Sequence, residues 1–384
     1  MELAAVLGNV HDLLVTIRTR APEIEQARRL PPDLAAALRA SGIFRLSVPV
    51  ALGGLQAPPA DLMRVAETVA TADGSAGWCA MVGIGNNVVA GYMPEDGARE
   101  VFADPAAPVA CSAAPAGQAV AADGGVRVTG RWAFASGITH CDWLWAGCLV
   151  MEDGQPRMTP AGPEMLHVCM PVSDVDLHDT WHVSGLSGSG SLDFSAADVF
   201  VPAARTFALL DPAGHRADPL YRLPPLGLFV YQLAAVGLGV ARRALDDLTE
   251  LAQAKVPSLY TAVLADKAVV QVEMARAEAA LGAARAYLYD AVDDLWQAVS
   301  AGREPTPRQV AAGRLASTHA VETAAAVART ACTLTGGSAI FDRSPMQRHM
   351  RDTEAMTHHF TVAPHTWEEA GRVLLGRPTI APAF

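Results

Sequence analysis

Residues 131–147, RWAFASGITHCDWLWAG, alternate large apolar residues with small or polar ones. This period of two predicts half-buried β-strand on both sides of a break at Ser136–Gly137, which is followed by His140. Serine and glycine are common at β-bulges, so one interpretation of the break is a bulge. The other interpretation is that the strand presents a hydroxyl group to a ligand at this point.

Short alternating runs of the same kind continue on both sides of this stretch, from about residue 105 to residue 205. They are GVRVTGRWAFA (125–135), DWLWAGCLVM (142–151), MLHVCMPV (165–172) and SLDFSAADVFVP (191–202). Gly, Asp, Pro and Ser separate them, which is typical of a small antiparallel barrel or sandwich. Residues 105–205 are therefore predicted to form a central antiparallel β-barrel domain.

Helical patterns flank this β region. In residues 1–104, PPDLAAALRASG (31–42) begins on proline and ends on glycine, and PADLMRVAETVATADGS (59–75) has apolar residues three and four apart. Residues 206–384 hold three long alanine-rich amphipathic segments and a fourth from Ser344 onward. Thr306, Pro307 and Gln309 predict a capping box at the start of the third. The fold class is thus a multi-domain α+β protein: a helical domain, a barrel and a four-helix bundle.

The bulk properties exclude several classes of protein. The 384 residues are 51% hydrophobic and 18% charged, which allows a large core, and the net charge of −11 opposes binding of nucleic acid. Residues 1–20 are apolar at helical spacing but are broken by His11, Asp12 and Arg18, so they predict neither a signal peptide nor a membrane span. We expect a cytoplasmic protein. Because the alanine-rich bundle has more apolar face than one chain can cover, we expect a homotetramer or at least a dimer.

The six cysteines have no CxxC spacing, so a structural zinc site or a disulfide framework is not expected. We predict that they are small buried hydrophobic residues. They are Cys79, Cys111, Cys141, Cys148, Cys169 and Cys332.

Five motifs in order along the chain resemble one known family. They are ALRASGIFRLSVPVALGG (37–54), ADGSAGWCAM (72–81), RWAFASGITHCDW (131–143), TWHVSGLSGSGSLDFSAADVFVP (180–202) and LTGGSAIFDRSPMQRHMRD (334–352). The chain resembles the acyl-CoA dehydrogenase fold, and within it the branch of two-component flavin-dependent monooxygenases. The resemblance implies an oxygenase component that uses reduced FMN, or FAD, and O2 to hydroxylate an aromatic, phenolic small molecule through a C4a-hydroperoxyflavin. No GxGxxG element follows a strand, so the reduced flavin is expected from a separate NAD(P)H:flavin reductase.

The resemblance also implies which residues contact the flavin, with Ser136 near its N5 atom. The expected cofactor-binding residues are Cys111, Ser112, Phe134, Ser136, Gly137, Trp181, Ser184, Gly336, Gly337 and Arg348. Arg348 and Arg351 lie three apart on one helix face and suit a flavin phosphate, from this or a neighbouring subunit, or surface ion pairs equally. Where the family commonly has a basic residue, this chain has Ser187.

The segment RDTEAMTHHFTVAPHTW, residues 351–367, is the candidate for acid–base chemistry. Dehydrogenases of this fold often place a catalytic glutamate eight residues after the equivalent of Asp352, where this chain has Phe360. His359 stands where the monooxygenase branch carries a histidine thought to act as a base, and a pKa near working pH suits that task. Adjacent histidines point to different helix faces, so His358 and His359 are not expected to share a metal ion. His140, with Ser136, is expected to stabilise the flavin adduct.

Trp78, Asn86 and His358 are the candidate substrate contacts. Asn86 and Asn87 interrupt the apolar stretch MVGIGNNVVAGYM (81–93), and a buried asparagine more often makes a structural hydrogen bond. Two alternative functions remain open from the sequence. One is a flavin-dependent dehydrogenase or desaturase of a small molecule or a carrier-bound acyl group, and the other is a non-catalytic flavin-binding homologue, for which Ser187 is the only indication.

Overall fold

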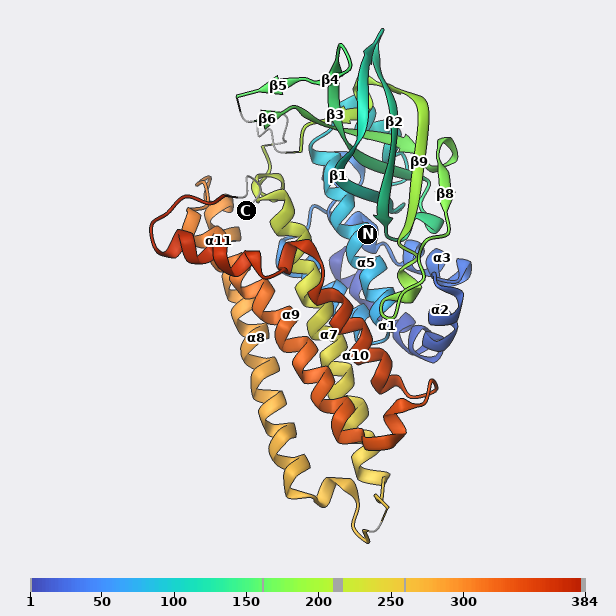
Figure 1. Cartoon of the computed structure of the whole chain (residues 1–384), viewed down its shortest axis with the longest axis vertical. Coiled ribbons are helices and arrows are strands. Elements are labelled where there is room, and N and C mark those ends of the chain that lie inside the picture. Colours follow the sequence, from blue (N-terminus) through green and yellow to red (C-terminus); the bar gives the residue numbers. More distant parts are fainter. Residues whose placement is uncertain (1, 161, 210–216, 259, 381–384) are drawn as a thin grey trace.

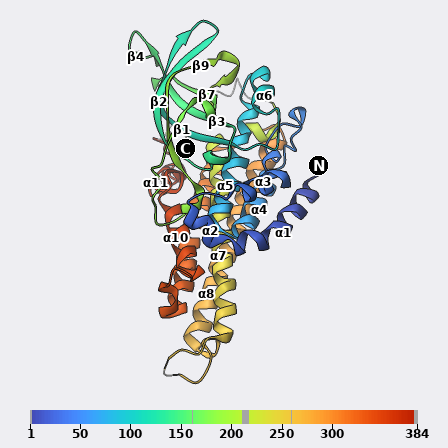
Figure 2. The same ribbon diagram turned by 90° about the vertical axis from the view of Figure 1, so that its right-hand side faces the viewer.

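The computed structural model describes residues 2–160, 162–209, 217–258 and 260–380. The predicted sequence of a helical domain, a β domain and a helical bundle is confirmed. In Figure 1 the sheet lies above the long helices of the bundle, and Figure 2 shows the N-terminal helices beside both.

Six helices form the N-terminal domain. They are α1 (Leu3–Thr19), α2 (Ala21–Ala27), α3 (Pro32–Ser41), α4 (Pro59–Ala70), α5 (Gly74–Asn86) and α6 (Glu95–Val101). Residues 59–75 hold two elements, because α4 ends at Ala70 and the Asp73 side chain accepts the N–H of Ala76 as the N-cap of α5. Every residue of α5 is buried, so this helix runs through the middle of the molecule and can carry side chains to an internal site.

The β domain is built around one eight-stranded sheet with the order β10-β7-β3-β1-β2-β9-β8, and β4 pairs with β3. Its strands are β1 (Val109–Ala122), β2 (Gly125–Ala135), β3 (Trp143–Glu152), β4 (Gln155–Pro156), β7 (Met165–Pro171), β8 (Asp176–His178), β9 (Leu192–Pro202) and β10 (Thr206–Phe207). The short strands β5 (Met158–Thr159) and β6 (Gly162–Pro163) pair separately. The sheet is mixed rather than wholly antiparallel, since β1 and β3 run parallel. The chain leaves β2 through a turn and a 3-10 helix (Ile138–His140), which reverse its direction. It then enters β3 on the other side of β1 from β2, so β3 runs antiparallel to β2 and parallel to β1.

The break at Ser136–Gly137 is the turn that ends β2. The irregularity in pairing with β9 lies just before it, between Trp132 and Ala135, where Phe134 has φ +65°. Gly137 has φ +72°, and its N–H donates to the Ser189 carbonyl at 2.8 Å. A Cβ atom at Gly137 would lie 2.9 Å from the His140 ring, so glycine is required there for space as well as for backbone conformation.

The C-terminal bundle consists of four long helices and a short final one. They are α7 (Pro225–Ala254), α8 (Ala268–Ser300), α9 (Pro307–Thr335), α10 (Pro345–Thr357) and α11 (His365–Leu374). The capping box of Thr306 and Gln309 is confirmed. Helix α7 is long and apolar enough to cross a membrane, but 78% of its apolar window is buried inside the protein, where it packs against α4, α5, α9 and α10. Helix α8 lies on the outside of the bundle, and all six cysteines of the chain are free, three of them fully buried.

Candidate active site

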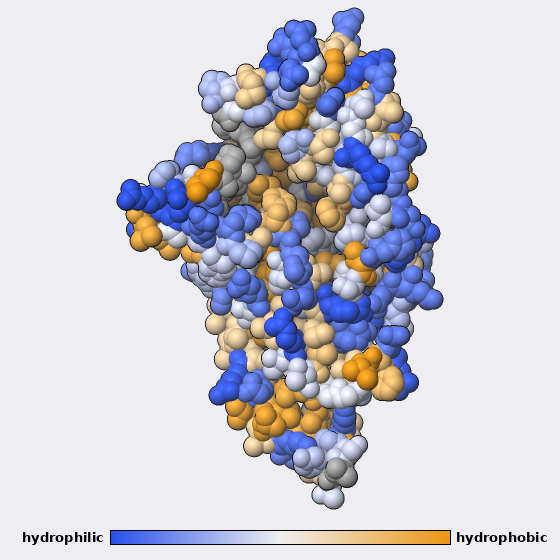
Figure 3. Space-filling view, viewed as in Figure 1, coloured by the Kyte–Doolittle hydropathy of each residue, from blue (hydrophilic) through white to orange (hydrophobic). Residues whose placement is uncertain are grey.

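A cavity of about 1510 Å³ lies between the sheet, α5, α7 and α10. The hollow between the sheet and the bundle is visible on the surface, where apolar side chains line it (Figure 3). All three domains contribute to its wall. Ten of the predicted site residues line it: Trp78, Asn86, Cys111, Ser112, Phe134, Ser136, Trp181, Ser184, His358 and His359.

Five predicted site residues do not line this cavity: Gly137, His140, Arg348, Gly336 and Gly337. Gly137 forms the turn that ends β2, and its N–H bonds the Ser189 carbonyl. The two later glycines follow α9 at the end of the bundle away from the sheet (Figure 1), where Lys255 bonds the Thr335 carbonyl. Within one chain they are therefore far from the cavity, and their contact with the flavin stays a prediction.

The side chain of Arg348 is directed into the protein. It is buried and lies 3.6 Å from the Glu25 carboxylate and 3.9 Å from that of Asp73. Within this chain Arg348 therefore faces two carboxylates, in a buried place rather than on the surface, and its contact with a flavin phosphate stays a prediction. Arg351, three residues later, does line the cavity, and its guanidinium bonds the Glu25 carboxylate and the Ser184 carbonyl.

His140 lies behind the turn at Gly137. Burial lowers its pKa to about 4, so the ring is neutral at pH 7. Its Nδ1 has no hydrogen-bond partner among the described residues. The ring packs against Gly137, and its predicted role beside the flavin adduct stays a prediction.

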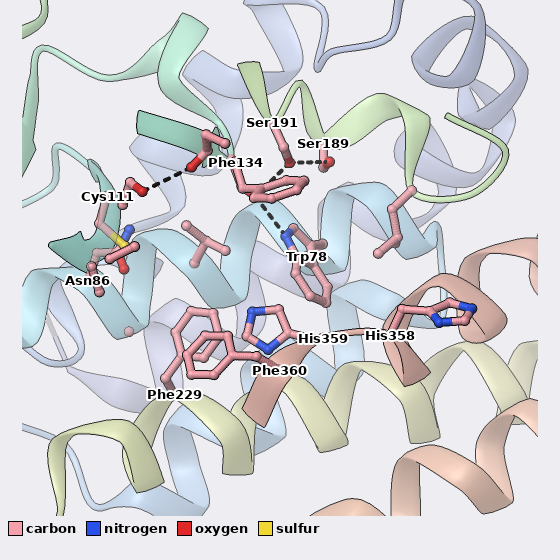
Figure 4. A pocket seen from close by; sticks show the side chains of 18 of the residues that line it. Trp78, Asn86, Cys111, Phe134, Ser189, Ser191, Phe229, His358, His359 and Phe360 are labelled. Atoms are coloured by element: carbon pink, nitrogen blue, oxygen red, sulfur yellow. Dashed lines mark hydrogen bonds between the residues drawn. The ribbon is translucent and has the colours of Figure 1, made fainter. Parts of the chain in front are cut away.

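A chain of hydroxyl groups begins at Ser136, at the end of β2. Trp78 on α5 donates its Nε1–H to Ser136 Oγ at 3.0 Å. Ser136 Oγ lies 2.6 Å from Ser191 Oγ, which lies 2.8 Å from Ser189 Oγ. Figure 4 marks the bond between Ser191 and Ser189. Sequence reasoning missed Ser189 and Ser191. The signal that could have found them is the alternation in SGSGS (187–191), which places Ser187, Ser189 and Ser191 two residues apart.

The segment 180–191 is fixed by helices of the other two domains. The Leu186 N–H donates to Asp352 on α10 at 2.6 Å, and the Gly188 N–H donates to Ser75 on α5 at 3.1 Å. A Cβ atom at Gly185 would lie 2.1 Å from the Arg351 carbonyl. The small residues here therefore permit close packing of this segment against protein backbone. Ser187 is buried, bonds the Val183 carbonyl and does not line the cavity.

Phe134 and Trp181 form an aromatic pair in the cavity wall. Their ring centres are 6.2 Å apart and the rings are nearly perpendicular. The Phe134 side chain is 70% exposed, and its left-handed backbone is uncommon for a residue of this size. The Trp181 ring is held by a hydrogen bond from Nε1 to the Leu186 carbonyl. A large flat apolar surface is thus held open toward the cavity.

Asn86 and Asn87 make the structural hydrogen bonds expected of them. Asn86 donates to the Val109 carbonyl at 2.9 Å, and Asn87 donates to the Phe44 and Ala107 carbonyls and accepts the Val109 N–H. These bonds tie the end of α5 to the start of β1. Asn86 also lines the cavity, beside Cys111 (Figure 4).

His359 follows the end of α10 and lies in an aromatic cluster (Figure 4). Its ring centre is 5.8 Å from that of Trp78, 5.4 Å from Phe229 and 4.9 Å from Phe360. Nδ1 is 2.7 Å from Thr361 Oγ1 and accepts the Thr361 backbone N–H at 3.3 Å, and these contacts fix the ring orientation. As acceptor of that N–H, Nδ1 leaves the hydrogen of the neutral ring on Nε2, whereas Nδ1 donating to Oγ1 makes Nε2 the acceptor. Nε2 makes no hydrogen bond within the described part of the chain and is available to a ligand.

Burial lowers the pKa of His359 to about 4, with a smaller contribution from the positive charge of Arg314. This value lies below the pKa near working pH that the sequence led us to expect, because the apolar surroundings penalise the charged ring. At pH 7 the imidazole is neutral, and with its hydrogen on Nδ1 it can accept a hydrogen bond from a substrate hydroxyl group at Nε2. An acidic substrate bound beside it would raise its proton affinity.

This environment predicts the pH dependence of any step that needs neutral His359. Because the lowered pKa favours the neutral ring, the rate should be level between pH 6 and pH 8 and should fall only as pH approaches about 4. The rate measured across this range with saturating cofactor, or the NMR titration of the ring, checks this. A midpoint near the ordinary value of 6.5 would show that water reaches the ring.

Glu354 is the one carboxylate among the described residues that line the cavity, and it pairs with Arg329. Phe360, at the position of the dehydrogenase glutamate, also lines the cavity. The geometry therefore offers no unpaired carboxylate for removal of an α-proton, which disfavours the dehydrogenase alternative.

Comparison with known proteins agrees with the fold and the cavity. The family model for the acyl-CoA dehydrogenase N-terminal domain matches residues 6–103, and the model for the C-terminal domain matches residues 231–364. An indole-3-acetate monooxygenase from Pseudomonas putida is 34% identical over 97% of this chain and 93% of its own length. The flavin-dependent monooxygenase oxygenase subunit HsaA from Mycobacterium tuberculosis is 30% identical over 93% of this chain and 92% of its own. The structure of XiaF from Streptomyces sp. in complex with FADH2 and glycerol superposes with a TM-score of 0.91 at 26% identity, covering 100% of this chain and 98% of that one.

The chain therefore belongs to the acyl-CoA dehydrogenase family. Within it, the chain stands in the branch formed by oxygenase components of flavin-dependent monooxygenases, as the resemblance of the five motifs indicated.

Proposed function

We propose that this protein is the oxygenase component of a two-component flavin-dependent monooxygenase that hydroxylates an aromatic small molecule. The observation that carries the proposal is the position of His359, whose free Nε2 lies in an aromatic cavity beside Trp78 and Phe229. The names of its relatives, which are monooxygenases dependent on flavin or acting on an indole compound, support the same class of reaction.

The cavity fits a reduced flavin. Its volume is sufficient, and the exposed face of Phe134 beside Trp181 suits a flat apolar ring system. Ser136 and Ser112 place hydroxyl groups on the same wall, where the polar edge of the ring needs hydrogen-bond partners. Bound there, reduced flavin supplies the electrons and the site of oxygen activation.

The protein's own residues bind, orient and exclude water. The lining is mostly aromatic and aliphatic, and exclusion of water by these walls and the bound ligands favours transfer of oxygen to substrate over release of hydrogen peroxide. His359 accepts the proton of a substrate hydroxyl or N–H group at Nε2 in the tautomer whose Nδ1 carries the ring hydrogen and donates it to Thr361 Oγ1. A separate NAD(P)H:flavin reductase supplies the reduced flavin, and the enzyme acts in the cytoplasm.

One titration tests the proposal. The protein is mixed anaerobically with reduced FMN or FAD and then exposed to O2 with phenol, resorcinol or indole-3-acetate, and the hydroxylated product is measured. Product formed in proportion to reduced flavin is expected. Flavin bleaching driven by substrate without O2 would instead support a dehydrogenase, and absence of flavin binding would support a non-catalytic homologue.

We also propose a homotetramer, with apolar side chains on the outside of the bundle buried between subunits. Exposed apolar residues lie on α8, after α9 and at the end of α11: Val269, Val272, Tyr287, Ile340, Phe341, Leu374 and Leu375. Light scattering at micromolar concentration should give four times the chain mass of 40.2 kDa. A monomer would remove this proposal and any flavin contact of Gly336 and Gly337 across subunits.

A further inference from the structure

The three hydroxyl groups of Ser136, Ser191 and Ser189 form a continuous chain that the proposed reaction does not yet use. All three residues are buried and all three line the cavity. Only Ser136 was expected from the sequence to face the flavin. Its partner on one side, Trp78, comes from the N-terminal domain, and its partner on the other side, Ser191, lies just before β9.

The hydrogen bonds at Ser136 can be arranged in two ways. A hydroxyl group has one hydrogen to donate and two lone pairs to accept with, whereas the indole of Trp78 can only donate. Trp78 therefore occupies one lone pair of Ser136 in either arrangement. The 2.6 Å contact between Ser136 and Ser191 needs one hydrogen, and either residue can supply it.

The two arrangements give Ser136 opposite properties toward the cavity. When Ser136 donates to Ser191, and Ser191 in turn donates to Ser189, Ser136 keeps one free lone pair and acts as an acceptor. When Ser189 donates to Ser191 and Ser191 donates to Ser136, both lone pairs of Ser136 are filled and its hydrogen is free to donate. To reverse the direction of these hydrogen bonds, each of the three serine hydroxyl groups only has to rotate about its Cβ–Oγ bond.

We propose that Ser191, supported by Ser189, is a positioning residue that lets Ser136 match both redox states of the flavin. The N5 atom of oxidised flavin accepts a hydrogen bond, whereas N5 of reduced flavin carries a hydrogen and donates one. This inference rests on the proposed function, because it requires flavin N5 to face Ser136.

Removal of the Ser191 hydroxyl should affect the two redox states unequally. In Ser191→Ala, Ser136 can still donate to oxidised flavin. When it accepts from reduced flavin, its own buried hydrogen has no acceptor among the described neighbours, since Trp78 only donates. A buried unsatisfied donor of this kind should weaken binding of reduced flavin about 10-fold to 100-fold. Each tenfold corresponds to a midpoint potential about 30 mV lower for the bound two-electron couple.

The experiment measures the dissociation constants of oxidised and reduced FMN for the full-length protein under anaerobic conditions. The ratio of the reduced to the oxidised constant should rise at least about tenfold in Ser191→Ala. Ser191→Thr, which keeps a hydroxyl group, should restore the ratio of the parent. Ser189→Ala should shift the ratio in the same direction, because Ser191 then has no acceptor for its own hydrogen. If Ser191→Ala does not fold, Ser189→Ala provides the test in its place.

Ser187→Ala is the matched control. It removes a buried hydroxyl group from the same segment, but this group bonds the Val183 carbonyl and not the other serine hydroxyl groups. Its ratio should equal that of the parent. Equal weakening of both redox states in Ser191→Ala, or no change, overturns the inference and leaves the proposed function standing. A parent protein that binds neither form of flavin overturns both.

Discussion

Replacement of His359 by alanine should slow oxygenation of the aromatic substrate about 100-fold to 10,000-fold, the usual contribution of a positioned acid–base group. Binding of reduced flavin should change little, because the ring contacts Trp78, Phe229 and Phe360 rather than the chain of serines. The measurement is product formed per reduced flavin consumed, with the dissociation constant of flavin determined separately. Flavin oxidation should continue in the variant and yield hydrogen peroxide in place of product.

His358→Ala is the internal comparison for this variant. His358 also lines the cavity, but it is exposed and lies outside the aromatic cluster, so a smaller effect is expected. A larger effect at His358 would show that the base is assigned one residue too far along the chain. If neither histidine mattered while Glu354→Gln abolished turnover, the base would be a carboxylate and the dehydrogenase alternative would gain support.

Replacement of Ser136 by alanine should weaken binding of reduced flavin about 10-fold to 100-fold, which is the cost of losing one hydrogen bond to a partly charged edge. It also leaves the Trp78 N–H without its acceptor. Anaerobic fluorescence titration with reduced FMN measures the effect, and thermal unfolding shows whether the fold is intact. Ser136→Thr keeps the hydroxyl group and should remain close to the parent. An alanine variant that binds flavin as the parent does would leave Ser136 as a residue of the turn alone.

Much of the architecture could be predicted from local patterns. Proline and glycine at the ends of residues 31–42, and the capping box at Thr306, act within a few residues and define helix ends without knowledge of the rest of the fold. The parallel direction of β3 could not be predicted in this way. It depends on which side of β1 the chain enters after the turn at Gly137, and alternation of apolar residues contains no information on strand neighbours.

The site was predicted best where the chemistry depends on one side chain at the end of an element. Trp78, Ser136 and His359 come from three domains, yet the resemblance places all three in one cavity and the structure confirms it. The ion pairs of Arg348 could not be predicted from the sequence, because the partners, Glu25 and Asp73, are more than 270 positions away. The pKa of His359 was also missed, because the degree of burial that lowers it follows from packing between domains.

The cavity wall, which takes side chains from the helical domain, the sheet and the bundle, has a consequence for folding. The complete cavity exists only when all three domains are docked against one another. Any ligand that binds only this docked state stabilises the whole chain by mass action, by about 2.7 kcal/mol at a concentration 100 times the dissociation constant. Supply of reduced flavin would then raise the apparent melting temperature, and cells short of cofactor would hold a larger fraction of incompletely docked, protease-sensitive chains.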